Sequence, residues 1–304
     1  MNDSNDAVAF FEKKELVWQT GKAPCVVNSF MSRTDFFPFD GSKRQFDVIL
    51  PPDYDAQKKY PVLFMYDGQN LFREVDGWNA PQTAARLADS GVIPPVVIVG
   101  LYHGGIQRGG EYFPQDAWNC IPEEIIEKTK EFAPQGCMSN LYLDWAVHTV
   151  KPYVFDNFSV TRDKDFVFIA GSSMGALMAL NACLTYPEEF GGAGCLSTHW
   201  RGCRPPFPAV DSYLIDWVKK EVCSASLTNA KFYFDHGDGN GNLNDLDAGY
   251  GPSQNKIDAI MRKNGYQESL GNYKSISFEH AAHHEKFWSE RFAGVLEFLL
   301  KQRD

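Results

Sequence analysis

The sequence lacks a strongly basic region and a long apolar run. Its 304 residues include 29 Lys and Arg against 39 Asp and Glu, which gives a net charge of −10, and no long cluster of Lys or Arg occurs. Nucleic acids and anionic membranes are bound largely through positive charge, so both are poor candidate partners. No stretch reaches the roughly 18 apolar residues that suggest a membrane span. We therefore expect neither a nucleic-acid nor a membrane partner.

Paired cysteines and a leader sequence are also missing. The seven cysteines are odd in number and form no CxxC pair, so we interpret them as buried free thiols in a reducing compartment. A secretory leader has basic residues before an apolar core, whereas residues 1–18 carry acidic residues in that place and have no long apolar core. We therefore expect a cytoplasmic protein, although a chain whose leader had been removed would have the same sequence.

Metal-binding motifs are incomplete. Asp238, Asn240 and Asn242 alternate like the start of a calcium loop, but Leu243 occupies the position of the required Gly and no Glu follows at the twelfth position. Zinc lacks a ligand motif, although three histidines lie close together near residue 280. We therefore expect no metal and no other cofactor.

The composition that remains is that of a folded α/β protein. Hydrophobic residues make up 44% and charged residues 22% of the chain, as in globular proteins, and this length can form one domain with a substantial core. We predict one α/β domain over residues 1–304. Within it, residues 1–22 form a peripheral segment with a short helix, and residues 102–139 form a long irregular loop region.

Apolar, β-rich runs alternate with runs of helical spacing along the chain. We expect strands at 25–31, 44–50, 61–66, 95–101, 166–170, 194–198, 231–234 and 275–278, and helices at 80–89, 141–157, 210–222, 253–263 and 285–302. The first two strands should be antiparallel. The alternation of strand and helix after them indicates a mostly parallel central sheet with helices on both faces.

The segment 165–186 reads DFVFIAGSSMGALMALNACLTY and predicts a strand, a tight turn and a helix. Its turn holds the G-x-S-x-G pattern, with Ser173 between Gly171 and Gly175. The glycines let strand and helix approach closely around a strained serine. The N–H of Met174, at the helix N-terminus, is placed to stabilise an oxyanion. We predict that Ser173 is a nucleophile, with an ordinary Gly-rich turn as the alternative.

A serine nucleophile needs a base and an orienting acid. In a strand–elbow–helix protein these follow in the order Asp, then His, on loops after later strands. Three of the seven histidines cluster after the last strand, and His283 is our candidate base, with His284 as the alternative. Histidines that only cap a helix or face solvent are the other interpretation.

The acid and the second oxyanion donor are left open by spacing alone. The loop after residue 234 offers four acids, Asp235, Asp238, Asp245 and Asp247. Asp238 is nearest the strand end and Asp247 leads into the next helix, so both remain candidates. The turn after the strand at 61–66 offers Gly68 or Gln69 as a backbone donor, and a plain β-turn is compatible with that role.

Several segments together resemble one protein family. In chain order they are VLFMYDGQNLF, GLYHGGIQRGGEYFP, FIAGSSMGALMAL, CLSTHW, YFDHG followed by LDAGY, and HHEKFW. The set, which spans residues 44–300, is similar to the esterases related to enterochelin esterase, S-formylglutathione hydrolase, feruloyl and acetylxylan esterases and the mycolyltransferases. The resemblance implies an α/β-hydrolase fold and acyl-ester chemistry without a metal cofactor.

The resemblance also implies roles for individual residues. By position, the matches are Ser173 for the nucleophile, His283 for the base, Asp247 for the acid, and Gln69 with Met174 for the oxyanion donors. The chain departs from the family in a longer loop over residues 237–246. It also has Ala176 in place of a frequent glycine, a change that a helix tolerates.

Five residues are candidates for lining the substrate pocket. His199 and Trp200 follow the strand after the elbow, and Arg108, Glu111 and Tyr112 lie in the long loop region. The alternatives are core packing for Trp200 and structural ion pairs for Arg108 and Glu111.

The predicted activity is that of a serine carboxylic-ester hydrolase that works through an acyl-enzyme. Its substrate would be an acyl ester of a carbohydrate, a siderophore, or a small alcohol or thiol. An acyltransferase or peptidase with the same three residues is one alternative, and a catalytically silent binding protein on the same fold is another. Loop sequences do not define the shape of a pocket, so neither the particular ester nor the oligomeric state is predicted.

Overall fold

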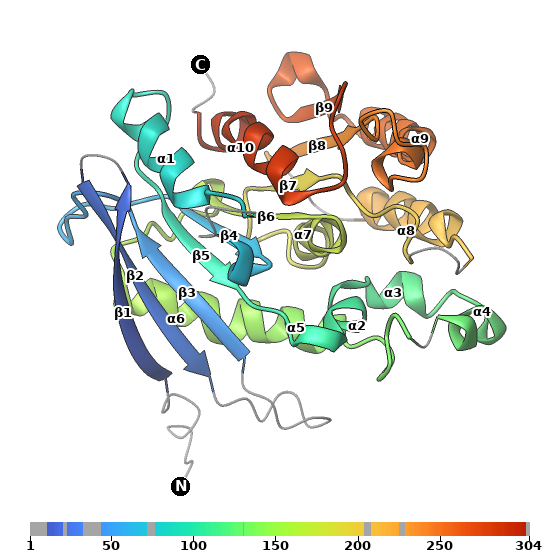
Figure 1. Cartoon of the computed structure of the whole chain (residues 1–304), viewed down its shortest axis with the longest axis horizontal. Helices are drawn as coiled ribbons and strands as arrows, with labels where there is room; N and C mark the ends of the chain where they lie inside the picture. Colours follow the sequence, from blue (N-terminus) through green and yellow to red (C-terminus); the bar gives the residue numbers. More distant parts are fainter. Residues whose placement is uncertain are drawn as a thin grey trace, which may run out of the picture.

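The computed structural model describes residues 11–20, 23–32, 44–71, 77–129, 131–203, 208–224 and 229–301. These ranges contain one nine-stranded sheet (Figure 1). Its strands are β1 (Phe11–Thr20), β2 (Ala23–Ser32), β3 (Arg44–Leu50), β4 (Val62–Tyr66), β5 (Val97–Leu101), β6 (Val167–Ser172), β7 (Gly192–Leu196), β8 (Lys231–Gly237) and β9 (Tyr273–Phe278).

The sheet is antiparallel at one edge and parallel elsewhere. Its strand order is β1-β2-β3-β5-β4-β6-β7-β8-β9. Antiparallel pairing joins β1, β2, β3 and β5, whereas all pairs from β5 through β4 to β9 are parallel. The predicted mostly parallel central sheet is confirmed.

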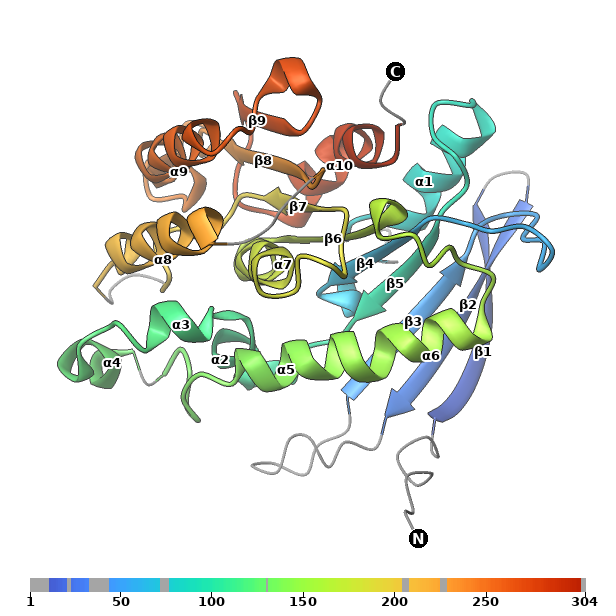
Figure 2. The same cartoon turned by 180° about the vertical axis from the view of Figure 1, so that it is seen from behind.

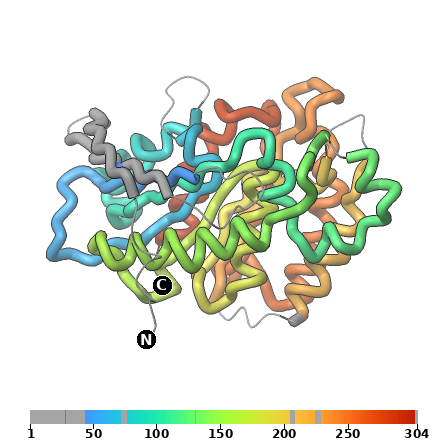
Figure 3. The backbone as a smooth tube through the Cα atoms, turned by 90° about the horizontal axis from the view of Figure 1, so that it is seen from below, coloured from blue at the N-terminus to red at the C-terminus, as the bar shows by residue number. Residues whose placement is uncertain are grey.

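Helices cover both faces of the sheet (Figures 1 and 2). One face carries α1 and α10, and the other carries α5 to α9; seen from below, the segment with α5 and α6 lies in front of the sheet (Figure 3). The helices are α1 (Ala80–Asp89), α2 (Arg108–Tyr112), α3 (Gln115–Trp118), α4 (Glu123–Lys128), α5 (Ser139–Trp145), α6 (Lys151–Asn157), α7 (Met174–Thr185), α8 (Asp211–Ser224), α9 (Gly251–Lys263) and α10 (Glu285–Leu300). Short 3-10 turns are η2 (Gly68–Asn70), η3 (Gly105–Gln107), η5 (Lys164–Phe166), η6 (Asp247–Gly249) and η7 (Glu268–Leu270).

Strand β4 shows how the two helical layers share the sheet. Its five residues are all buried. Phe64 and Tyr66 belong to the core on the α7 side, whereas Leu63 and Met65 belong to the core on the α10 side. Successive side chains of a strand point to opposite faces, so an entirely apolar run is buried on both sides.

Three predicted segments are corrected. Residues 11–20 form β1 rather than a short helix, because their backbone pairs along its whole length with β2, and residues 1–10 lie outside the described part. The single helix predicted at 141–157 is divided into α5 and α6 by a π-helical turn (Ala146–Val150). Pro152, near the start of α6, has no N–H for the regular hydrogen bond one turn back. The loop region 102–139 contains η3 and three short helices, α2, α3 and α4.

The cysteines match the expectation only in part. The six cysteines outside β2 are free. Cys183, Cys195 and Cys203 are buried as expected, whereas Cys120 and Cys223 are exposed. Within the described ranges no helix is both long and apolar enough to cross a membrane.

The parallel strands bring the predicted site residues to one edge of the sheet. The turns that follow β4, β6, β7, β8 and β9 all leave the carboxyl ends of parallel strands. Ligand sites of open α/β sheets form in the crevice at this edge. Ser173 follows β6, Asp247 lies in η6 after β8, and His283 lies between β9 and α10.

The closest strand–helix approach at this edge generates a first prediction. A Cβ atom added at Gly171 would lie 2.6 Å from the backbone of Gly175, which cannot move aside easily. Overpacking of this kind costs about 1–3 kcal/mol. Gly171→Ala should therefore lower the midpoint of thermal or urea unfolding. Gly294→Ala is the matched control, because the nearest atom to its new Cβ, Tyr233 Oη, is 4.0 Å away within a helix, where Ala is favoured over Gly. Equal midpoints for the two variants would contradict the prediction.

Candidate active site

The turn around Ser173 has the strained geometry that the sequence predicts. Strand β6 ends at Ser172 and α7 begins at Met174, and Ser173 between them has φ 58° and ψ −122°. A non-glycine residue in this region is strained by about 1–3 kcal/mol and persists only where its surroundings hold it. Here the N–H of Ser173 donates to Leu196 O on the neighbouring strand, at 2.9 Å. The turn is therefore fixed, with its serine at the end of the sheet.

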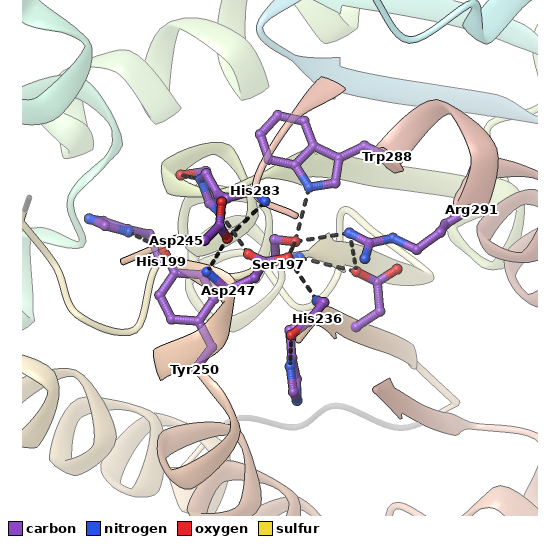
Figure 4. A network of polar contacts seen from close by, with 12 residues as sticks. Ser197, His199, His236, Asp245, Asp247, Tyr250, His283, Trp288 and Arg291 are labelled. Carbon is purple, nitrogen blue, oxygen red and sulfur yellow. Dashed lines mark hydrogen bonds and ion pairs between the residues drawn. The ribbon is translucent and has the colours of Figure 1, made fainter. Parts of the chain in front are cut away.

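Three of the predicted residues form one hydrogen-bonded chain. His283 Nε2 lies 2.9 Å from Ser173 Oγ, and His283 Nδ1 lies 2.7 Å from Asp247 Oδ1. These are the contacts that a serine, a base and an orienting acid require. Figure 4 shows the imidazole of His283 against the Asp247 carboxylate. His284, the alternative base, instead caps α10, because its ring accepts a hydrogen bond from Lys286 N.

The two candidate acids have different surroundings. Asp247 is fully buried and contacts His283. Asp238 is exposed, and its carboxylate accepts hydrogen bonds from the backbone N–H groups of His280, Ala281 and Asn240. These bonds, that of His280 first, lower the pKa of Asp238. Asp238 therefore ties the loop after β8 to the loop that carries His283, and Asp247 is the acid in contact with the imidazole.

The carboxylate of Asp247 is ionised although it is buried. Burial alone would raise its pKa, but hydrogen bonds from His283, Ser197 and Gly237 outweigh burial and leave the pKa below its ordinary value. Gly237 N and Ser197 Oγ both donate to Oδ2, each at 2.7 Å. Oδ1 is thereby left to His283. A carboxylate held at both oxygens fixes the orientation of the imidazole.

The two predicted oxyanion donors are backbone N–H groups on separate turns. Met174 is the first residue of α7, so its N–H has no partner within the helix. Gln69 lies in η2, the turn after β4. This turn starts from Asp67 at φ 58°, and it packs so closely on β5 that a Cβ at Gly68 would lie 2.6 Å from Gly100 C. Both predicted donors therefore belong to rigid turns at the same edge of the sheet.

Arg108 and Tyr112 hold the turn that contains Gln69. The guanidinium of Arg108 donates to both oxygens of Asp67, at 2.6 and 2.7 Å. Burial disfavours the charge of Arg108, but Asp67 outweighs it and raises the pKa of the guanidinium. Tyr112 is fully buried, and its hydroxyl accepts a hydrogen bond from Asp67 N at 3.2 Å. The same helix carries Glu111, which forms a buried ion pair with Arg44.

His199 and Trp200 are buried rather than exposed at the surface of the site. Trp200 is 1% exposed, and its Nε1 donates to Gln254 Oε1 at 2.7 Å, as in the core-packing alternative. His199 is also 1% exposed, and its Nδ1 contacts the hydroxyl of Tyr250. The ring of Tyr250 in turn stands edge to face with His283 at 5.6 Å. His199 thus contacts the tyrosine that packs against the imidazole of His283.

Within the described ranges, no group of three or more His, Cys, Asp and Glu side chains could hold a metal ion.

Comparison with known proteins places the chain in a family. The family model described as "Putative esterase" matches residues 40–299. The chain belongs to this esterase family. Ester hydrolysis and the α/β-hydrolase fold that the sequence resemblance implied are thereby shown, and the chain is a carboxylic ester hydrolase.

Individual relatives of the esterase are distant. The "Uncharacterized protein YbbA" of Bacillus subtilis (strain 168) is 24% identical over 261 residues, which cover 84% of the esterase and 92% of that protein. A solved ferulic acid esterase has a TM-score of 0.64 at 18% identity, covering 91% and 98% of the two chains. The ferric enterobactin esterase of Salmonella typhimurium has a TM-score of 0.59 at 17% identity, covering 92% of the esterase and 59% of that protein. At these identities the solved structures share the fold.

Ser197, Trp288 and Asp67 are among the residues of the site that were missed in the sequence. The hydroxyl of Ser197 donates to Asp247 and accepts a hydrogen bond from Trp288 Nε1, and Asp67 anchors the turn that contains Gln69. Trp288 stands in the HHEKFW segment, which was a usable signal. A single serine after a strand carries no comparable signal.

The Asp67–Arg108 pair generates a second prediction. Arg108→Gln would leave the carboxylate of Asp67, which is 3% exposed, without its bidentate partner. An uncompensated buried charge costs about 3–5 kcal/mol, so we expect a clearly lower unfolding midpoint in urea. Arg162→Gln is the control, since Arg162 and Asp156 are 65% and 66% exposed and such pairs contribute about 1 kcal/mol or less. Similar losses in the two variants would refute a structural role for the pair.

Proposed function

We propose that the esterase is a serine esterase that works through an acyl-enzyme on Ser173. The observation that carries the proposal is the continuous hydrogen-bonded chain from Ser173 Oγ through His283 to Asp247. A serine hydroxyl is a weak nucleophile, and an adjacent base activates it. Ser173 Oγ attacks the ester carbonyl carbon while His283 Nε2 takes its proton.

The first half of the reaction ends with loss of the alcohol. Attack converts the carbonyl oxygen to an oxyanion, which the N–H groups of Met174 and Gln69 would bind. Donors fixed before the reaction stabilise such charge without reorganising. The protonated His283 then gives its proton to the departing alcohol or thiol, and the acyl group stays on Ser173.

The second half regenerates the serine. A water molecule takes the place of the alcohol, gives a proton to His283 Nε2 and attacks the acyl carbon. Collapse of the second tetrahedral species returns this proton to Ser173 Oγ and releases the acid. Asp247 stays ionised throughout, because it holds the Nδ1 proton of the imidazole by a hydrogen bond rather than by taking it.

The proposed substrate class is supported by the site and by the names of the neighbours. A mechanism that needs only an acyl carbonyl accepts esters of carbohydrates, siderophores, and small alcohols or thiols. The names of structural neighbours include ferulic acid esterase and ferric enterobactin esterase, so aromatic acyl esters and siderophore esters are the first substrates to test. The proposed small-molecule substrate contacts the carboxyl edge of the sheet, near Arg108 and His199, with Tyr112 and Trp200 behind them.

Removal of the nucleophile is the main test. Ser173→Ala should lower ester hydrolysis by a factor on the order of 10⁴ to 10⁶, because triad deletions have this effect. A fluorophosphonate probe should label the wild type at Ser173 and leave the variant unlabelled, as read by peptide mapping. Full activity in the Ser173→Ala protein would refute the proposal. A folded wild type that neither reacts with the probe nor hydrolyses any ester would favour a binding protein on the same fold.

The choice of acid has a separate test. Asp247→Asn should lower kcat on the order of 10⁴-fold, since the amide no longer holds the correct tautomer of His283. Asp238→Asn removes a carboxylate of the same loop without touching the imidazole, so kcat should stay within about threefold. Both variants are compared by initial rates with one ester. The reverse ranking would transfer the role of acid to Asp238.

A further inference from the structure

A buried ion pair lies behind the acid of the proposed triad. Arg291 of α10 and Asp235 of β8 are 4% and 0% exposed, and Nη2 of Arg291 lies 3.2 Å from Oδ1 of Asp235. The same Nη2 is 2.9 Å from Ser197 Oγ, which is 2.7 Å from Asp247 Oδ2. One hydroxyl therefore connects the ion pair to the acid (Figure 4).

The direction of these hydrogen bonds is fixed by their donors. A serine hydroxyl has one proton to donate and two lone pairs to accept. Trp288 Nε1 and Arg291 Nη2 can only donate, and both point at Ser197 Oγ from 2.9 Å. With both lone pairs occupied, the hydroxyl proton of Ser197 must go to Asp247. The two donors thus force Ser197 to hold Asp247 Oδ2, which leaves Oδ1 for His283.

Arg291 is a costly residue at this position. Its Nε and Nη1 atoms are buried and have no hydrogen-bond partner among the described residues. A buried guanidinium that is only partly satisfied carries a desolvation penalty, and apolar residues of similar size are often more stable in such places. An unsatisfied buried group needs a reason other than stability. Its contact with Ser197, which in turn donates to the acid Asp247, supplies one.

We propose that Arg291 is a positioning residue for the proposed ester hydrolysis, acting through Ser197 on the acid Asp247. Asp235 offsets the charge of Arg291, so that Arg291 holds Ser197 without making His283 a weaker base. This inference rests on the proposed function, in which His283 must be neutral to accept the proton of Ser173.

The sign of the effect follows from the charges. The positive charge of Arg291 opposes formation of a protonated His283, so its removal should raise the pKa of the imidazole. The negative charge of Asp235 compensates Arg291, so its removal should lower the same pKa. Two charges several ångströms apart in a protein interact enough to move a pKa by about half a unit to one unit.

The charged and titratable groups around Arg291 come from several elements. Asp235 and Tyr233 belong to β8, with the hydroxyl of Tyr233 3.1 Å from Asp235 Oδ2. Asp247 comes from η6 and His283 from the loop after β9. Burial raises the pKa of Asp235 to about 6, against the opposing effect of Arg291. A raised pKa leaves less negative charge on Asp235 in acid, so its removal should shift the profile less than removal of Arg291.

The test is the pH dependence of kcat/KM in three variants. In Arg291→Gln we expect kcat to fall about ten- to a hundredfold with little change in KM, as for a misplaced catalytic group. Its acid limb should move to higher pH by about half a unit to one unit. The acid limb of Asp235→Asn should move to lower pH. In the double variant, where the pair is removed as a unit, the limb should return close to that of the wild type while kcat stays low.

Two further variants separate charge from structure. Arg291→Lys keeps the charge and should restore most of the wild-type acid limb. Arg262→Gln removes an equal charge from α9, where Arg262 forms an exposed pair with Glu268 of η7, and it should not shift the acid limb. Unfolding midpoints of all variants are measured alongside. An unchanged acid limb in both single variants, or shifts in the same direction, would overturn the proposal and leave Arg291 a structural residue.

A readout without substrate distinguishes this proposal from the proposed function. The imidazole pKa of His283 is measured by NMR of ring-labelled histidine, with His283→Gln for assignment. Opposite shifts in Arg291→Gln and Asp235→Asn would support the proposed effect of these two charges on His283, even in a protein that hydrolyses no ester. Failure of the serine mechanism would instead appear as a wild type that the fluorophosphonate does not label. Imidazole pKa values that agree within about 0.2 units across all variants would refute the proposed role of Arg291 and Asp235 and leave the serine mechanism untouched.

Discussion

The positive φ of Ser173, held between β6 and α7, is the constraint on which the rest of the site depends. This conformation turns the chain sharply at the sheet edge and leaves the first N–H groups of α7 free to bind an anion. It is strained, and it survives because α7 is buried along most of its length and because Gly171 and Gly175 let strand and helix nearly touch. The rigid core is thus used to keep one serine in an unfavourable backbone geometry.

Three buried ion pairs lie in the segments that form the site. Asp67 with Arg108, Glu111 with Arg44, and Asp235 with Arg291 each join two separate segments. Pairs of this kind contribute little net stability, but breaking one is expensive. They therefore fix the positions of the loops, because moving a loop would break an ion pair and leave a buried charge without its partner. Each loop that supplies a proposed catalytic group or backbone donor has such a tie close by.

Local patterns predicted the parts of the structure that local chemistry determines. The apolar strand at residues 166–170 and the G-x-S-x-G turn carry their structure in their own sequence. A short helix was expected in the N-terminal segment, whereas residues 11–20 form a strand because their backbone pairs with β2. The choice between Asp238 and Asp247 depends on the path of a long loop, and this path cannot be deduced from the spacing of the residues in the sequence. Arg291 was missed because a lone arginine in a C-terminal helix usually faces solvent.

The order of the site along the chain has a consequence for synthesis. Ser173 and His283 are 110 residues apart, and Trp288 and Arg291 follow His283 on the last helix of the described chain. The N-terminal part of a chain is synthesised first and leaves the ribosome first. Of the three residues of the proposed triad, the base is therefore the last to be synthesised. A chain that ended before His283 would have Ser173 without the imidazole that the proposed mechanism needs, so such a truncated product should not hydrolyse esters.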